Sequence, residues 1–155
     1  MEKFRSVLDK VIEIFCTVIM MIMTILVSWQ VFTRYVFNKP SAVTEQLTQY
    51  LFIWLVLFGS AFIFGKREHM QIIFIKDKFP VKIGMICDIF QEIIVFIFTI
   101  GVLVGGGYLS SVRQMAQTDA ALQIPMGVIY IAIPLSGVFI IFYSILNIKH
   151  IITKK

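Results

Sequence analysis

Charged side chains are scarce in this sequence. Asp, Glu, Lys and Arg make up only 15% of its 155 residues, whereas 59% of the residues are hydrophobic. A soluble domain of this length needs a larger polar fraction to cover its surface. The composition therefore excludes an ordinary soluble domain and indicates a membrane protein.

Residues that usually carry chemistry are also few. The two cysteines, Cys16 and Cys87, lack the paired spacing of a metal site, and both fall near the side of the membrane that we predict to be cytoplasmic and reducing. His69 and His150 lie at membrane edges on that same side, which argues against a bis-histidine haem site. No serine or cysteine has an evident catalytic base. We therefore expect no catalytic residue, no cofactor and no metal site in this chain.

Long uncharged runs dominate the sequence instead. Windows of 20 residues without charge cover 14–33, 46–65 and 93–112, and a longer window covers 120–148. About 20 helical residues cross the roughly 30 Å of a bilayer core, and these windows lack the alternation of barrel strands. The sequence predicts an all-α membrane protein. It forms one membrane domain, residues 1–155, with four transmembrane helices at about 11–36, 44–65, 81–112 and 125–149.

Basic residues predict the orientation of these helices. Eleven of the fourteen lysines and arginines lie on one side of the predicted spans: Lys3, Arg5, Lys10, Lys66, Arg67, Lys76, Lys78, Lys82, Lys149, Lys154 and Lys155. The positive-inside rule then places both termini and the middle loop on the cytoplasmic side of the membrane. These residues flank spans rather than form one dense patch, so we expect contact with lipid headgroups and no binding of nucleic acid.

Several residues predict where the helices begin, end or break. Residues 38–41 form a turn signal, after which either Ser41 or Thr44 can cap the second helix. The segment 70–80 is too short to span and too apolar for a free loop, so we expect it to lie in the membrane interface. The third span has 32 residues, about 48 Å as a helix, and must tilt, bend or project. Pro125 suits the first turn of the fourth helix, and Pro134 should kink that helix.

Small and polar residues mark the faces on which these helices pack. Gly101 and Gly105 form a GxxxG pair, Ala61 and Gly65 lie on the second helix, and Ala132 and Ser136 lie on the fourth. Such residues let membrane helices approach closely, either within this chain or against another subunit. A polar stripe, Glu13, Thr17, Thr24 and Ser28, follows one face of the first helix and is typical of helix packing. Trp54 lies deeper than the other aromatic residues and is a candidate for a partner contact.

Three segments together resemble one family, the small DctQ-type membrane subunit of TRAP transporters. QVFTRYVF at 30–37 resembles the end of that family's first span, including Tyr35. TEQLTQYLFIWLVLFGSAFIFGKREHMQI at 44–72 is similar to its second-span block, in which a glutamate opens the helix and a histidine, here His69, follows a basic stretch. QIPMGVIYIAIPL at 123–135 is similar to its fourth-span entry, with Pro125, Tyr130 and Pro134 in order. Relatives often have a Trp before an acidic pair, whereas here residues 42–44 are Ala-Val-Thr and the second acid is Gln46, which puts that pair's role in doubt.

The resemblance implies a sodium-coupled importer of three proteins. A periplasmic binding protein captures an organic acid, and a large membrane subunit binds sodium and substrate and moves them by an elevator motion. The small subunit is implied to be a fixed scaffold that helps to dock the binding protein. The substrate class, such as a C4-dicarboxylate or sialic acid, is left open. The alternative is a small homo-oligomeric four-helix proton-coupled exporter, for which Glu13 is the candidate carboxylate.

The resemblance also changes the interpretation of Arg34. Composition alone makes it a boundary residue that extends to the outer headgroups. Gln30 and Arg34 are four residues apart and share a helix face. From that face they can instead join the first helix to Glu45 at the start of the second helix, or to a neighbouring subunit. Helices three and four, through Gly101, Gly105, Ala132 and Ser136, are our expected contact with the large subunit.

Overall fold

The computed structural model describes residues 2–38, 41–66 and 81–153, and the side chains within 5–38, 41–66 and 89–149. The first two helices are α1 (Glu2–Val36) and α2 (Ala42–Lys66). The third comprises α4 (Val81–Phe98), η1 (Thr99–Gly106) and α5 (Gly107–Gln114), and the fourth comprises α6 (Met126–Tyr130) and α7 (Ala132–Thr153). Four helices are long and apolar enough to cross a membrane, which confirms the predicted all-α, four-helix class. The predicted interfacial segment 70–80 and His69 lie outside the described residues.

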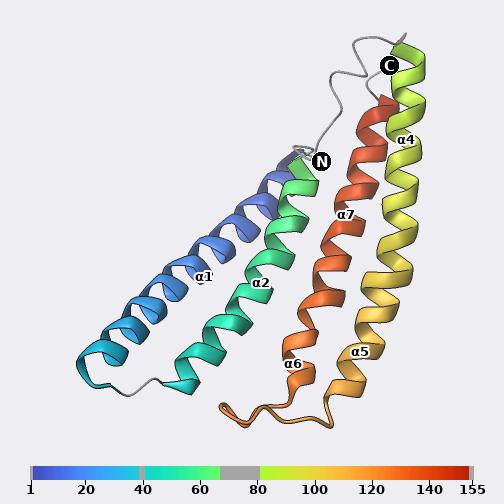
Figure 1. The fold of residues 1–155 in the computed structure, drawn as a ribbon. Coiled ribbons are helices and arrows are strands. Elements are labelled where there is room, and N and C mark those ends of the chain that lie inside the picture. The colour runs from blue at the N-terminus through green and yellow to red at the C-terminus, as the bar shows by residue number, and fades with distance from the viewer. Residues whose placement is uncertain (1, 39–40, 67–80, 154–155) are drawn as a thin grey trace.

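The helices form a single row rather than a closed bundle (Figure 1). In the described part of the chain α1 packs on α2, α2 packs on α7, and α7 packs on the long third helix. Viewed along the helix axes, the start of α1 and the end of α7 lie toward the same end of the molecule, which we call the terminal end. The end of α1, the start of α2 and the loop between α5 and α6 lie at the opposite end of the helices, which we call the hairpin end. A row of this kind has two broad faces and two edges, α1 and the third helix.

Local chemistry explains the helix ends. Asn38, two residues after the end of α1, adopts a left-handed backbone with φ 51°, which asparagine tolerates well. The Ser41 hydroxyl accepts a hydrogen bond from the Thr44 N–H at 3.4 Å, so Ser41 rather than Thr44 caps α2. Pro125 has extended backbone (ψ 127°) and immediately precedes α6, one position earlier than predicted.

Pro134 interrupts the fourth helix as the sequence predicts. A proline has no N–H to donate to the carbonyl four residues earlier, here that of Tyr130, and its ring crowds that carbonyl. The structure accordingly ends α6 at Tyr130 and begins α7 at Ala132. Hydrogen bonding continues on either side, from Ile131 N–H to the Gly127 carbonyl at 3.1 Å and from Leu135 N–H to the Ile131 carbonyl at 3.2 Å.

The third helix contains a π-helical segment that the sequence analysis did not predict. Residues Thr99–Gly106 form wider turns between two α-helical parts. Gly105, Gly106 and Gly107 have no β-carbon, so the widened backbone meets little steric resistance there. The long predicted span is therefore one nearly continuous helix with an altered middle.

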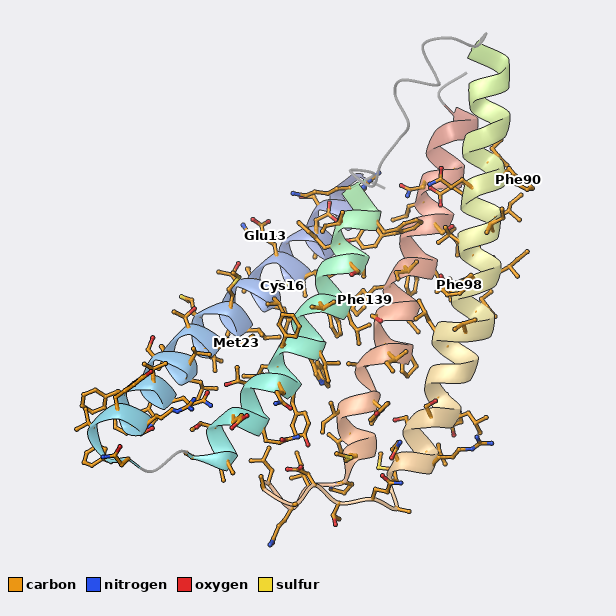
Figure 2. All side chains as sticks on the ribbon, viewed as in Figure 1. Glu13, Cys16, Met23, Phe90, Phe98 and Phe139 are labelled. Atoms are coloured by element: carbon orange, nitrogen blue, oxygen red, sulfur yellow. The ribbon has the colours of Figure 1, made fainter. Side chains whose placement is uncertain are left out.

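An aromatic core joins α1, α2 and α7. Phe15 of α1 lies 4.9 Å from Phe58 of α2 between ring centroids, and Phe58 lies 5.6 Å from Phe139 of α7. Figure 2 shows Phe139 between α2 and α7. Trp54 stacks on Phe58 with 5.8 Å between centroids. Aromatic pairs at these distances favour such tilted and stacked arrangements.

Candidate interaction surfaces

Several of the predicted small residues lie between helices of this chain. Ala61 and Ala132 are fully buried, and so is Ser136, whose hydroxyl donates to the Ile133 carbonyl at 2.8 Å. A β-carbon added to Gly65 would sit 2.5 Å from Cε1 of Tyr143. These positions allow α2 and α7 to approach closely, so they are used within the chain and are not free for another subunit.

Two further glycines bring the third and fourth helices together. A β-carbon on Gly107 would lie 3.0 Å from Cδ of Pro134, and one on Gly127 would lie 2.4 Å from the Ser111 carbonyl oxygen. The Ser111 hydroxyl donates to the Gly127 carbonyl at 2.8 Å. Gly107 therefore makes room for the proline that interrupts the fourth helix.

Gly101 and Gly105 do not take part in this packing. Both are exposed, and a β-carbon on Gly101 would meet no atom within 4 Å. The nearest neighbour of a β-carbon on Gly105 would be the Ile100 carbonyl of its own helix, at 3.4 Å. The GxxxG pair thus faces away from the fourth helix.

A polar cluster ties three helices at the terminal end. The Tyr143 hydroxyl of α7 donates to Asp9 Oδ1 of α1 at 2.6 Å, and Tyr143 itself is fully buried. Arg5, one turn earlier on α1, donates to the Gly65 carbonyl at the end of α2. Cations near the C-terminus of a helix satisfy its last carbonyls and favour its dipole. The sequence analysis counted Arg5 only as an orientation signal.

Asp119 anchors the loop at the hairpin end. Its carboxylate accepts hydrogen bonds from the Leu122 N–H at 2.8 Å and the Ala121 N–H at 3.2 Å, and another from the Tyr50 hydroxyl of α2. The hydrogen bond from the Leu122 N–H is the main reason that the pKa of Asp119 lies below its ordinary value. Burial acts in the opposite direction, whereas the hydrogen bonds from Tyr50 and Ala121 lower the pKa further. Tyr50 in turn accepts from Gln46 at 2.8 Å. The signal for this anchor in the sequence is weak, because it consists of one acidic residue in a polar loop.

A buried carboxylate also joins α4 to α7. Ser144 donates to Glu92 Oε2 at 3.0 Å, and Glu92 is only 7% exposed. Asn147 is buried one turn beyond Ser144. A carboxylate at the border of one apolar window, together with polar residues inside another window, is the signal that could have predicted this contact.

The motif residues at the end of α1 remain outside the packed part of the molecule. Arg34 and Glu45 are both exposed, and the described residues form no hydrogen bond or ion pair between them. Tyr35 is 78% exposed, and Gln30 is partly buried. The structure therefore does not join Arg34 to Glu45 within this chain, and contact with a neighbouring subunit stays a prediction.

The remaining predicted residues lie within the row. Trp54 packs against Phe15 and Phe58 of this chain. Tyr130 ends α6, which packs on α5 and touches α2. Among the described side chains, no group of three or more His, Cys, Asp or Glu residues is arranged to hold a metal ion.

The polar stripe of α1 faces away from the other described helices of this chain, so packing of the stripe on another helix stays a prediction that a neighbouring subunit would have to fulfil. Glu13, Thr17, Thr24 and Ser28 are all exposed, and Figure 2 shows Glu13 on the side of α1 away from α2. Each hydroxyl donates to the carbonyl four residues earlier, Thr17 to Glu13 at 2.7 Å, Thr24 to Met20 at 2.8 Å and Ser28 to Thr24 at 2.7 Å. Within the described chain, α1 contacts α2 through its opposite side.

The fold and these surfaces define a class: a multi-pass helical membrane protein whose buried polar groups join its own helices. The family model for the DctQ component of tripartite ATP-independent periplasmic (TRAP) transporters matches residues 23–154. The chain therefore belongs to the DctQ family. It is a transporter component of the inner membrane, not an enzyme.

Individual relatives agree with this assignment. The chain is 28% identical over 142 residues to the sialic acid TRAP transporter small permease protein SiaQ of Vibrio cholerae, covering 92% of this chain and 82% of that protein. It is 26% identical over 140 residues to a putative TRAP transporter small permease protein of Haemophilus influenzae, covering 90% and 86%. A stretch of 68 residues, 44% of this chain, is 31% identical to 11% of the sialic acid TRAP transporter permease protein SiaT of Haemophilus influenzae.

Proposed function

We propose that this chain is the fixed scaffold subunit of a sodium-coupled TRAP importer of an organic acid. In this proposal it supports a large elevator-type permease subunit, which binds the sodium ions and the substrate, and it helps to dock a periplasmic binding protein. Both termini lie in the cytoplasm, so the hairpin end faces the periplasm. A C4-dicarboxylate, sialic acid or a similar carboxylate is the substrate class.

The row of helices is the observation that supports this proposal best. In the part of the chain that the structure describes, the helices form a single layer (Figure 1), and two buried polar pairs, Glu92 with Ser144 and Ser111 with Gly127, join neighbouring helices. Transport sites in membrane proteins need polar groups gathered at a mid-membrane cavity. A row that lacks such an enclosure requires another protein to form the path.

The exporter alternative has less support. It needs a carboxylate that lines a shared path, and Glu13 is exposed near one end of the outer edge of the row. The membership of the chain in the DctQ family also favours a role in uptake beside a permease.

Reconstitution tests the proposal directly. The large permease subunit from the same organism is placed in liposomes with or without this chain, together with its purified binding protein and an inward sodium gradient. We expect uptake of a labelled carboxylate only when this chain is present, and we expect the two subunits to co-purify in mild detergent. Undiminished uptake without this chain, combined with failure to co-purify, would contradict the proposal.

A further inference from the structure

We propose that the outer side of α1 is the surface on which the large permease subunit docks. The contact is a membrane helix of that subunit that presents hydrogen-bond donors to Glu13, Thr17, Thr24 and Ser28. This inference rests on the proposed function and adds to it the docking face and the chemistry of the contact.

The geometry of α1 places these four residues together at the edge of the row. Ile12 and Ile19, which are 1% and 4% exposed, lie on the side that packs against α2. At roughly 100° per residue, the four polar positions fall on the opposite side of the helix. Met20 and Met21, 62% and 58% exposed, flank the stripe. This side is therefore an unpartnered surface that runs along most of the span.

The hydrogen bonds already formed determine what can cover this surface. The three hydroxyl protons are used by carbonyls of α1 itself. A hydroxyl retains acceptor lone pairs after it donates, and a carboxylate only accepts. The stripe therefore presents acceptors alone. Lipid tails offer no donor, whereas a protein helix that carries Ser, Thr, Asn, Gln or Trp does, with a basic group opposite Glu13.

The other edge of the row has different chemistry. The outward positions of α4 and the start of η1 are apolar: Phe90 is 64% exposed, Ile94 50% and Ile97 65%, and Gly101 follows them. Figure 2 shows Phe90 on the outer side of α4. Lipid covers such an edge at no cost in lost hydrogen bonds. We therefore propose α1, in place of helices three and four, as the part of this chain that faces the large subunit.

Charge disfavours a second copy of this chain as the occupant. Two copies in one membrane have the same orientation, so their α1 helices would pair in parallel around a two-fold axis. Glu13 would then approach Glu13, and each stripe would offer acceptors to acceptors. Like charges at close range in a poorly screened environment repel strongly.

The Haemophilus influenzae relative SiaT favours the large permease instead. Its similarity to this chain is confined to 11% of its own length, so a DctQ-like segment occurs there within a much longer permease protein. In SiaT, the segment similar to this chain and the rest of the permease therefore belong to one polypeptide, which favours a permease as the partner of this chain.

Site-specific photocrosslinking tests the inference in the complete complex. A photoreactive phenylalanine analogue replaces Thr17, Thr24 or Ser28 in turn, with Ile97 and Val102 of the opposite edge as controls, and this chain is co-expressed with the large subunit. We expect adducts between the two subunits from the three α1 positions and none from the two controls.

The other outcomes of this experiment would overturn either the docking face or the proposed function. Adducts from Ile97 or Val102 only, adducts that join two copies of this chain, or no adduct from α1 in a complex that does co-purify would each overturn the docking face alone. Failure of the unmodified subunits to co-purify would overturn the proposed function, and the docking face with it.

A binding measurement tests the hydrogen bonds themselves. The variant Thr17→Val/Thr24→Val/Ser28→Ala keeps the shape of the stripe but removes its acceptors. Ser60→Ala is the matched control, because Ser60 of α2 is exposed and donates to the Val56 carbonyl at 2.7 Å in the same way. One hydrogen bond between membrane helices changes an association constant about threefold. We expect the triple variant to bind the large subunit in nanodiscs at least about tenfold more weakly and Ser60→Ala to bind normally, whereas equal affinities would refute the acceptor stripe.

Discussion

At the scale of single residues, the surroundings of a glycine decide what it contributes. Gly65 and Gly101 are both helical glycines in apolar spans. Gly65 lies against the ring of Tyr143, whereas Gly101 has open space where a side chain would be. The same residue type therefore permits close packing at one position and only weakens helix propensity at the other.

Alanine at these two glycines should have opposite effects. Gly65→Ala places a methyl group 2.5–2.7 Å from three atoms of a buried aromatic ring that is also held by Asp9, so we expect a loss of about 1–3 kcal/mol. Gly101→Ala should be neutral or stabilising by up to about 1 kcal/mol. Thermal unfolding in detergent measures both. If the Gly65→Ala protein were as stable as the Gly101→Ala protein, α2 and α7 would have to move apart at little cost.

Asp119 gives the hairpin end a predicted dependence on pH. Because its pKa is lowered in the folded protein, the stability it contributes is complete above the ordinary aspartate pKa of about 4 and is lost as the pH falls through the lowered value. Asp119→Asn should be less stable than wild type at neutral pH, and the difference should shrink on acidification. Unfolding midpoints across that range measure this effect. Thr118→Val, at an exposed neighbour, is the control, and a difference that stays constant with pH would contradict the assignment.

Arg34 should affect assembly more than a nearby lysine does. It is exposed and makes no contact with Glu45 in the described chain, so any role beyond marking the membrane boundary depends on a neighbouring subunit. We expect Arg34→Ala to lower co-purification with the large subunit, or uptake, more than Lys39→Ala does. Equal and negligible effects would leave Arg34 as a boundary residue.

At the scale of helices, apolar packing is combined with polar contacts near the helix ends. Tyr143 and Asp9 join α7 to α1 at the terminal end, and Tyr50 and Asp119 join α2 to the loop between α5 and α6 at the hairpin end. In lipid the apolar side chains gain little from leaving the solvent, so close packing and hydrogen bonds between helices carry much of the association. These ties hold the fourth helix to the first two.

The tie between Tyr143 and Asp9 should be measurable as a coupling energy. We expect Tyr143→Phe and Asp9→Ala each to destabilise the protein, with a coupling of about 1 kcal/mol in a double-mutant cycle. Asp9→Asn keeps an acceptor for the tyrosine and should lose less. Additive effects of the two substitutions would show that the hydrogen bond does not contribute to stability.

At the scale of the whole molecule, the distribution of basic residues predicts the orientation of the row. Lys66 ends α2 at the terminal end, and Ala120 is exposed in the loop at the hairpin end. In a background without Cys16 and Cys87, a membrane-impermeant maleimide should label Ala120→Cys from outside intact spheroplasts. Lys66→Cys should react only after permeabilisation. The reverse pattern would invert the proposed orientation.

The sequence by itself determined the elements and the family of this protein. In a bilayer every backbone group must bond within its own helix, so uncharged windows, the turn at Asn38 and the interruption before Pro134 are local properties that the sequence expresses directly. The motifs around Tyr35, Pro125 and Tyr130 likewise predicted the DctQ family from residues close together in the chain.

Only the tertiary structure decided how those elements meet. Whether a small residue is used depends on which helix lies opposite, so Ala132 and Ser136 proved to be buried within the chain while Gly101 and Gly105 face outward. The anchor at Asp119 and the contact of Glu92 with Ser144 join residues far apart in sequence. The stripe on α1 follows a clear period, but its direction depends on where α2 lies. A helix forms from local bonds, whereas the position of its neighbours depends on contacts that no local pattern contains.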